Sequence, residues 1–285
     1  MNLDRRNFFK TMGVAGLTLI AGKSSGTELP EEGEIEFQGI LYDSTQCLGC
    51  RACEIACAES HGLPEPTDEM VPGVIRKTSE LQRTVVNTYK TSKGEVLVKS
   101  QCMHCNEPAC AAACLTKAMY KTKEGPVVWR GDKCMGCRYC MVSCPFDIPK
   151  FEYLSANPKI QKCDLCHDKI IKGEIPACVE ICGAALTFGT RRELIAEARK
   201  RIVENPDTYI PEIYGETVAG GTGILYLAAA PHKEIGLNTD LQNSSYPALS
   251  KSFLYTVPSV FVLLPPLLLG IHEATKNNHK EEENE

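Results

Sequence analysis

The cysteines are the residues of this sequence whose number and spacing most clearly indicate chemistry. There are 16 of them among 285 residues, and they form four groups of four with none left over. The groups are Cys47, Cys50, Cys53 and Cys57; Cys102, Cys105, Cys110 and Cys114; Cys134, Cys137, Cys140 and Cys144; and Cys163, Cys166, Cys178 and Cys182. Such groups can bind zinc or iron–sulfur clusters, or can pair as disulfides, so the spacing must decide.

The first and third groups have the spacing C-x2-C-x2-C-x3-C, which is typical of bacterial ferredoxins. One tight loop then supplies three of the four thiolates of a cubane cluster. The fourth cysteine, which we expect to begin a helix, usually binds the neighbouring cluster. Gly49 and Gly136 precede the second cysteine of these groups and let the backbone approach a cluster. The second and fourth groups lengthen the gap before their third cysteine, at Pro108 and at residues 167–177, which we interpret as loop insertions.

Zinc and disulfides fit this pattern less well. A structural zinc site needs only four ligands, usually two cysteine pairs, so each triplet offers one thiolate too many. Disulfides between cysteines this close in sequence are strained. His104 and His167 lie beside ligand cysteines. Because each group already has four cysteines, we expect these histidines to lie around the clusters or on the surface, without binding iron.

Four closed four-thiolate sites leave no open position for a substrate, which predicts a non-catalytic protein that accepts and donates single electrons. No catalytic triad, paired-carboxylate signature or flavin fingerprint stands out. The formal charge of −5 excludes a basic footprint for nucleic acid. Four basic residues adjoin ligands and either raise the reduction potentials or are solvated surface charges: Arg51, Lys133, Arg138 and Lys162.

The elements expected to position the cysteine loops are short. Residues 84–89 and 95–99 are predicted to be strands joined by a turn, and residues 224–227 a further strand. Thr190-Arg-Arg-Glu193 is a capping box that predicts a helix ending at Asn205-Pro206. We therefore predict an α+β fold with tandem or nested ferredoxin-like domains over residues 38–190, followed by a helix and strand extension over residues 191–250.

The two ends of the chain differ from the middle. Residues 1–27, with Arg5-Arg6 before a weakly apolar stretch, resemble a twin-arginine signal peptide, a route that exports folded, cofactor-loaded proteins. Residues 253–272 predict a transmembrane or membrane-inserted helix, before a polar tail over residues 273–285. Pro258, Pro265 and Pro266 argue against a straight helix, and the alternative is an apolar tail buried against a partner subunit.

The chain resembles the four-cluster ferredoxin-type subunits of molybdopterin oxidoreductase and hydrogenase complexes. Within that group it most resembles the HybA-like iron–sulfur subunits of hydrogenase-2-type [NiFe] hydrogenases. The segments that carry the resemblance are LYDSTQCLGCRAC from Leu41, QCMHCNEPAC from Gln101, GCRYCMVSCPFDIPK from Gly136, FGTRREL from Phe188 and GETVAGGTGILYLAAAP from Gly215.

Spacing alone permits the second group to share ligands with the third, or the third with the fourth. The resemblance implies a nested arrangement, first with fourth and second with third, holding four [4Fe–4S] clusters. The implied ligand sets are Cys47, Cys50, Cys53 and Cys182; Cys163, Cys166, Cys178 and Cys57; Cys102, Cys105, Cys110 and Cys144; and Cys134, Cys137, Cys140 and Cys114.

The resemblance also implies partners and a location. Electrons would pass from the small and large subunits of a periplasmic [NiFe] hydrogenase to an integral membrane subunit that reduces quinone, at the periplasmic side of the cytoplasmic membrane. The nearest alternative is the electron-transfer subunit of a molybdopterin oxidoreductase acting on formate or a sulfur compound. An alternative from another class is a structural metal-binding or disulfide-bonded interaction protein, which would lack iron and acid-labile sulfide.

Overall fold

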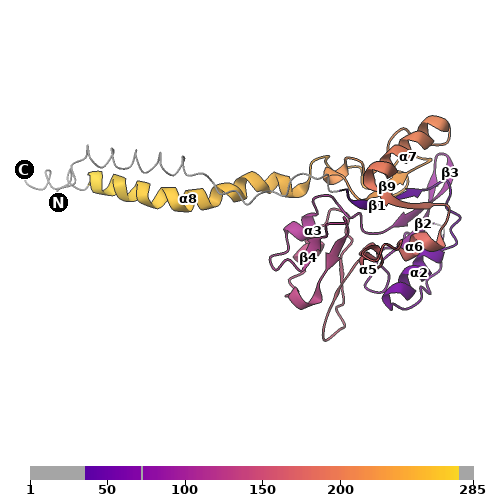
Figure 1. Cartoon of the computed structure of the whole chain (residues 1–285), viewed down its shortest axis with the longest axis horizontal. Helices are drawn as coiled ribbons and strands as arrows, with labels where there is room; N and C mark the ends of the chain where they lie inside the picture. Colours follow the sequence, from indigo (N-terminus) through magenta and orange to yellow (C-terminus); the bar gives the residue numbers. More distant parts are fainter. Residues whose placement is uncertain (1–35, 72, 276–285) are drawn as a thin grey trace, which may run out of the picture. The chain divides into compact units, whose positions relative to one another are not determined.

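The computed structural model describes residues 36–71 and 73–275 (Figure 1). The predicted twin-arginine segment and the tail from residue 276 lie outside the described residues. The chain divides into two units, one covering residues 35–249 and the other including the part of helix α8 from Ser250 onward. The strands are β1 Gln38–Asp43, β2 Val85–Thr91, β3 Gly94–Ser100, β4 Met119–Lys121, β5 Val127–Trp129, β6 Lys150–Phe151, β7 Ile160–Gln161, β8 Leu186–Thr190 and β9 Ile224–Leu227. The helices are α2 Ala52–His61, α3 Ala109–Ala112, α4 Tyr139–Val142, α5 His167–Ile170, α6 Ala177–Ile181, α7 Arg191–Glu204 and α8 Tyr246–Thr275, with 3-10 turns at Gly131–Lys133 and Val218–Gly220.

A three-stranded sheet joins the two ends of the larger unit. Strand β1 lies in its centre, antiparallel to β8 and parallel to β9. Side chains alternate across a strand, so Ile40 and Tyr42 face one apolar core while Leu41 faces a second core under α7, with Leu194 and Ala198. The sheet therefore connects the chain just before the first cysteine group to the chain just after the fourth.

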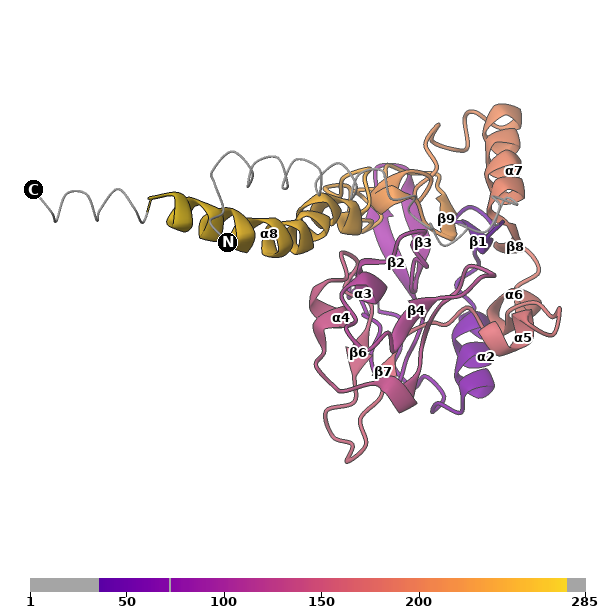
Figure 2. The same cartoon turned by 60° about the vertical axis from the view of Figure 1, so that its left-hand side comes forward.

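Antiparallel hairpins separate the cysteine groups. The β2–β3 hairpin lies between the first and second groups, β4–β5 between the second and third, and β6–β7 between the third and fourth (Figure 2). The β2–β3 pair, with Thr91 opposite Gly94 at the turn, confirms the predicted strands over residues 84–89 and 95–99. Strand β9 confirms the predicted strand at residues 224–227.

Helix α7 confirms the predicted capping box. The backbone N–H of Glu193 donates to the Thr190 hydroxyl, and the Glu193 carboxylate accepts from the Thr190 N–H at 3.1 Å. The helix ends at Glu204, before the predicted Asn205-Pro206 stop. The capping box therefore determines where α7 begins, and packing of one helix face against β1 holds the helix in place.

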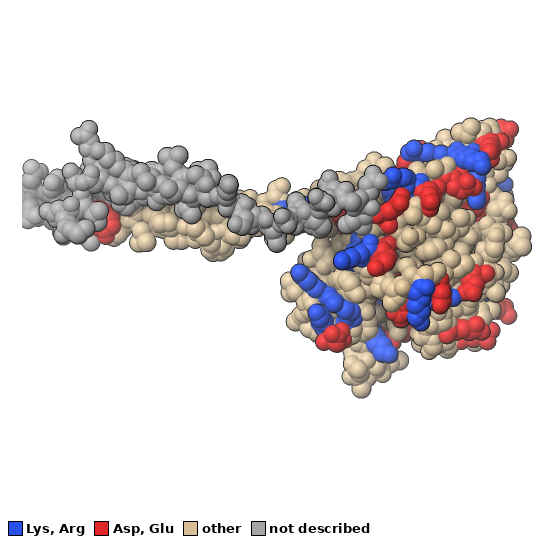
Figure 3. Space-filling model, in the orientation of Figure 1, with Lys and Arg blue, Asp and Glu red and all other residues tan. Residues whose placement is uncertain are grey.

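Helix α8 is 30 residues long and continues through Pro258, Pro265 and Pro266. An 18-residue window within its residues Tyr246–Glu273 has a mean hydropathy of 1.9, and it is the one helix within residues 36–71 and 73–275 that is long and apolar enough to cross a membrane. In Figure 3 its visible surface is almost entirely uncharged, whereas charges of both signs are interspersed over the visible face of the larger unit. The C-terminal helix can therefore anchor the chain to a membrane.

Candidate iron–sulfur sites

Each cysteine group begins with a turn in which the residue before the second cysteine has a positive φ angle. The four residues are Gly49 at 70°, His104 at 48°, Gly136 at 72° and Leu165 at 60°. A residue with a Cβ atom pays roughly 1–2 kcal/mol in this left-handed region. All four groups therefore share this left-handed residue, although it is a glycine in only two of them.

A short helix begins just before the third cysteine of each group. The third cysteines, in α2, α3, α4 and α6, are Cys53, Cys110, Cys140 and Cys178. The fourth cysteines are Cys57 within α2, and Cys114, Cys144 and Cys182 at or just beyond the ends of α3, α4 and α6. The prediction that the helix begins at the fourth cysteine is therefore wrong. A C-x3-C spacing spans about one helical turn, so the helix that leads to the fourth cysteine also carries the third.

These helices pack in two pairs. Helix α2 of the first group contacts α6 of the fourth, and α3 of the second group contacts α4 of the third. We call the first and fourth groups with α2, α5 and α6 the outer half, and the second and third groups with α3, α4 and the β4–β5 and β6–β7 hairpins the inner half. Figures 1 and 2 both show α2 beside α6.

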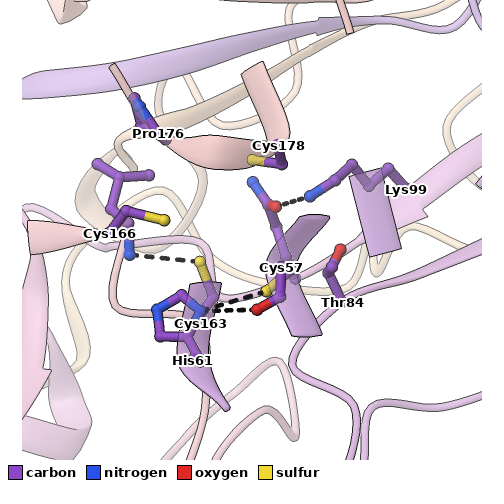
Figure 4. A pocket seen from close by; sticks show the side chains of 10 residues that line it. Cys57, His61, Thr84, Lys99, Cys163, Cys166, Pro176 and Cys178 are labelled. Atoms are coloured by element: carbon purple, nitrogen blue, oxygen red, sulfur yellow. Dashed lines mark hydrogen bonds between the residues drawn. The ribbon is translucent and has the colours of Figure 1, made fainter. Parts of the chain in front are cut away.

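A cavity in the outer half is lined by four cysteines from two groups. Cys57 of α2 faces Cys163, Cys166 and Cys178 of the fourth group. Figure 4 shows their sulfur atoms turned toward a common space. Fold geometry therefore brings Cys57 to three sulfur donors that lie more than a hundred residues further along the sequence.

A second cavity, in the inner half, has the same composition. It is lined by Cys114 of the second group and by Cys134, Cys137 and Cys140 of the third. Trp129 at the end of β5 also lines it. As in the outer half, the fourth cysteine of one group joins the first three cysteines of another.

The other eight cysteines do not line these two cavities. After the larger effect of burial, Cys102, Cys144 and Cys105 are near enough to Cys110 to raise the pKa of its thiol. Cys178 and Cys182 act in the same way on the thiol of Cys53. Cys47 and Cys182 pack against the apolar cluster that contains Cys53. Cys50 is exposed, as is Cys137, while the other cysteines are buried or half-buried.

Burial is the main cause of the raised pKa values of several cysteine thiols. It raises the pKa of Cys53 and of Cys105 to about 12 and that of Cys140 to about 11, and neighbouring sulfurs add to each rise. Free thiols at these positions would stay protonated at neutral pH. Because the thiolate is the metal ligand, these sites require a cation that displaces the proton.

Two lysines bring buried positive charge to the cysteines. The side chains of Lys99 and Lys162 are buried. Burial alone would lower their pKa values, but the nearby cysteine thiolates hold both values above the ordinary range. Lys121 differs, because it donates to the carbonyl oxygens of Cys105 and Gly125 at 2.8 and 2.9 Å, and burial lowers its pKa to about 8. Lys99 and Lys121 lie on β3 and β4 and are not adjacent to any ligand, so no motif identifies them.

Of the four basic residues predicted near the ligands, only Lys162 is buried. Lys133 and Arg138 are exposed, and Arg51 pairs with Glu54 at 2.9 Å. Exposure therefore favours solvated surface charge for Lys133, whereas Arg138 also lines the cavity of Cys114, Cys134, Cys137 and Cys140.

His61 is a site residue that no sequence motif indicates. Its Nδ1 atom lies 2.8 Å from the Cys57 carbonyl oxygen, and its Nε2 atom lies 2.9 Å from Asp164 Oδ1. Burial opposes protonation, but the bonds to Asp164, Cys166 and Cys57 outweigh it and raise the pKa of His61 to about 12. The imidazolium thus donates to Cys57 of the first group and to Asp164 of the fourth group, and so links these two groups. It lines the same cavity as Cys57 and Cys166 and does not form a separate site.

Two buried N–H groups next to the cysteines have no hydrogen-bond partner among the described residues. They are Nε2 of His104 and Nε1 of Trp129. His104 accepts the N–H of Val127 through Nδ1 at 2.9 Å, which leaves the proton on Nε2. His167, in contrast, lies 3.2 Å from the Glu124 carboxylate. Orphaned buried donors are costly, whereas the sulfur atoms of a cluster accept such hydrogen bonds. The donor sets and the unpaired N–H groups therefore fit bound [4Fe–4S] clusters.

Comparison with known proteins agrees with this chemistry. Residues 95–191 match the 4Fe-4S dicluster domain. The chain is 34% identical to the hydrogenase-2 operon protein HybA of Escherichia coli O157:H7 over 97% of each chain. It is 42% identical to a protein of Nitratidesulfovibrio vulgaris over 98% of this chain and 78% of that protein. It is 32% identical to the formate dehydrogenase-O iron–sulfur subunit of Escherichia coli K12 over 66% of this chain and 65% of that subunit.

HybA and the formate dehydrogenase-O subunit are electron-transfer iron–sulfur subunits, which confirms the predicted cofactor class and the predicted non-catalytic role. The chain belongs to the family of HybA-like, ferredoxin-type iron–sulfur subunits, which hold [4Fe–4S] clusters and transfer electrons within redox enzyme complexes.

Proposed function

We propose that this chain holds four [4Fe–4S] clusters in a nested ferredoxin-like arrangement. The proposed ligand sets are Cys47, Cys50, Cys53 and Cys182; Cys57, Cys163, Cys166 and Cys178; Cys102, Cys105, Cys110 and Cys144; and Cys114, Cys134, Cys137 and Cys140. The two cysteine-lined cavities and the α2–α6 and α3–α4 contacts support this assignment. No other grouping of four explains why Cys57 and Cys114 each face three cysteines of another group.

The apolar clusters suggest an order for the four sites. Cys53 and Cys178 share one cluster, Cys102 and Cys163 share a second, and Cys110 and Cys140 share a third. The buried cysteines of each apolar cluster come from two ligand sets, and these three pairs connect the four sites one after another in a line. The sets that contain Cys50 and Cys137 lie at its two ends. These are the two exposed cysteines, which is the arrangement that electron entry and exit require.

We propose that this line carries single electrons from a periplasmic [NiFe] hydrogenase to a membrane subunit that reduces quinone. Similarity to HybA over 97% of both chains is the observation that carries the proposal. The similarity to a formate dehydrogenase subunit supports a molybdopterin oxidoreductase as the alternative donor, but it covers only 66% of this chain.

We further propose that α8 anchors the chain at the periplasmic face of the cytoplasmic membrane. Its length and hydropathy support this placement, and the twin-arginine pattern at Arg5-Arg6 supports export. A chain ending at Ser250 should appear in the soluble fraction, while the full chain should resist extraction at high pH. Full-length protein that washes off at high pH would contradict the anchor.

The test of the electron-transfer proposal is Cys137→Ser in the assembled complex. It should stop electron transfer from H2 to quinone while transfer from H2 to an artificial dye at the hydrogenase persists. Iron and acid-labile sulfide measured on the same anaerobic preparation establish that the remaining clusters are present. Unchanged quinone reduction would refute the proposed path. Wild-type protein without iron and sulfide would instead favour a structural interaction protein.

A further inference from the structure

Lys162 lies where the outer half meets the inner half. Its Nζ atom is 3.7 Å from the Cys102 sulfur of the inner half and donates at 2.7 Å to the carbonyl oxygen of Cys163 in the outer half. A third contact is to the carbonyl oxygen of Val127. Cys102 and Cys163 share one small apolar cluster, so this is the point at which the proposed line of sites passes from one half to the other.

The Lys162 ammonium has no carboxylate partner there. Among residues 36–71 and 73–275, no carboxylate oxygen lies within 4.0 Å of its Nζ atom. Asp164 is the nearby candidate, and its two oxygens are engaged by His61 and by Arg83 at 2.9 and 2.8 Å. The side chain of Lys162 is only 4% exposed.

A buried ammonium without a counter-charge is strongly unfavourable. The groups that offset its charge are the sulfurs of Cys102, Cys110 and Cys163 and, with a smaller effect, the Asp164 carboxylate. The first two belong to one proposed ligand set and the third to the next. The charge of Lys162 is therefore balanced by two cluster sites together, one on each side of the join.

We propose that Lys162 is a positioning residue that raises the reduction potentials of the two clusters between which electrons pass from one half to the other. This inference rests on the proposed ligand sets. In the step itself, one electron leaves the reduced cluster on one side and is taken up by the oxidised cluster on the other, and Lys162 stays an ammonium throughout. A fixed positive charge favours the more negative, reduced state of each cluster.

Lys99 gives a comparison within the same molecule. It is also buried, and its ammonium hydrogen-bonds Gln101. The sulfurs around it are Cys178, Cys53, Cys163 and Cys57, which all belong to the two outer-half sets. Removing its charge should therefore change the outer-half clusters and leave the inner-half clusters unchanged.

Lys133 is the matched control for Lys162. Each lysine directly precedes the first cysteine of its group, but Lys133 is exposed. Solvent therefore screens its charge, and it makes no buried contact to a ligand. A comparison of the two lysines therefore separates the effect of burial on the reduction potentials from the effect of lying next to a ligand in the sequence.

The experiment is a redox titration of the full-length, cluster-loaded protein followed by electron paramagnetic resonance, with Lys162→Met, Lys99→Met and Lys133→Met. In Lys162→Met, two clusters, one in each half, should become harder to reduce by at least tenfold in equilibrium constant, which is about 59 mV per tenfold for a one-electron couple. Lys99→Met should shift only outer-half clusters, and Lys133→Met none.

Iron and sulfide content identifies which idea fails. If wild-type protein lacks clusters, the proposed function is wrong; if clusters are present but Lys162→Met leaves all potentials unchanged, only the role of Lys162 is wrong. Should Lys162→Met lose iron, Lys162→Gln keeps a donor to the carbonyl oxygens without the charge, and the same lowering is expected. Loss of iron in both variants would show that Lys162 only holds the loops together, and would overturn the inference.

Discussion

The outer and inner halves present cysteines with related spacing but stabilise them by different means. In the outer half, α2 is 10 residues long and its neighbours include the large apolar core beneath the β8-β1-β9 sheet. In the inner half, α3 and α4 have 4 residues each, and two of the five buried residues of its core cluster are the cysteines Cys110 and Cys140. The inner half therefore depends more on the cluster itself for its cohesion.

The two halves also differ in how far their ion pairs are buried. In the outer half, the fully buried Glu54 carboxylate accepts from Arg76 and Arg51 and from the backbone N–H of Val86. Arg76 also reaches Asp68, which fixes the loop after α2. The inner-half ion pair between Lys150 and Asp147, in contrast, includes a carboxylate that is 66% exposed. We therefore expect the outer-half sites to be held by a fold that is stable without the clusters, whereas the fold of the inner half depends on cluster binding.

Removal of the clusters should give the largest difference between the halves. After anaerobic chelation of iron, backbone amides of residues 102–161 should lose their protection from hydrogen exchange, while α2 of the outer half and the β8-β1-β9 sheet stay protected. Hydrogen–deuterium exchange with mass spectrometry measures this directly. Equal loss of protection in both halves would mean that their scaffolds do not differ in the way described.

Removal of single ligands should test which groups share a cluster. Trp129, the only tryptophan of the chain, lines the cavity of Cys114, Cys134, Cys137 and Cys140. A bound cluster should quench its fluorescence, so Cys114→Ala should raise the emission and Cys182→Ala should not. If the third group instead shares ligands with the fourth, the two variants should exchange their effects.

Loss of the buried carboxylate should have a smaller effect that is confined to stability. Glu54→Ala leaves Arg76 without its buried partner, which should reduce the free energy of unfolding by about 3–5 kcal/mol. The control is Glu204→Ala, which removes an exposed pair with Lys200 on α7 and should cost about 0.3–0.5 kcal/mol. Denaturant unfolding of cluster-loaded protein measures both. Similar small losses in the two variants would show that the charge network does not stabilise the outer half.

Several local elements could be predicted because neighbouring residues determine them. The β2–β3 hairpin follows from alternating side chains around a turn, and the start of α7 follows from the hydrogen bonds between Thr190 and Glu193. The helix starts within the cysteine groups were predicted wrongly. Cysteine spacing determines which sulfurs of a group can lie near one another, but it does not determine the residue at which the helix begins.

The sequence by itself determined the chemistry of this protein, because a loop with three cysteines in seven residues can surround a cluster corner whatever the rest of the chain does. It also determined the apolar helix α8, since composition decides hydropathy. Only the tertiary structure decided that Cys57 faces the fourth group, that His61 reaches Asp164, and that Lys162 is buried while Lys133 is exposed. The contacts and burial of these side chains depend on which segments, distant in the sequence, pack around them and exclude water. That packing is a property of the tertiary structure alone.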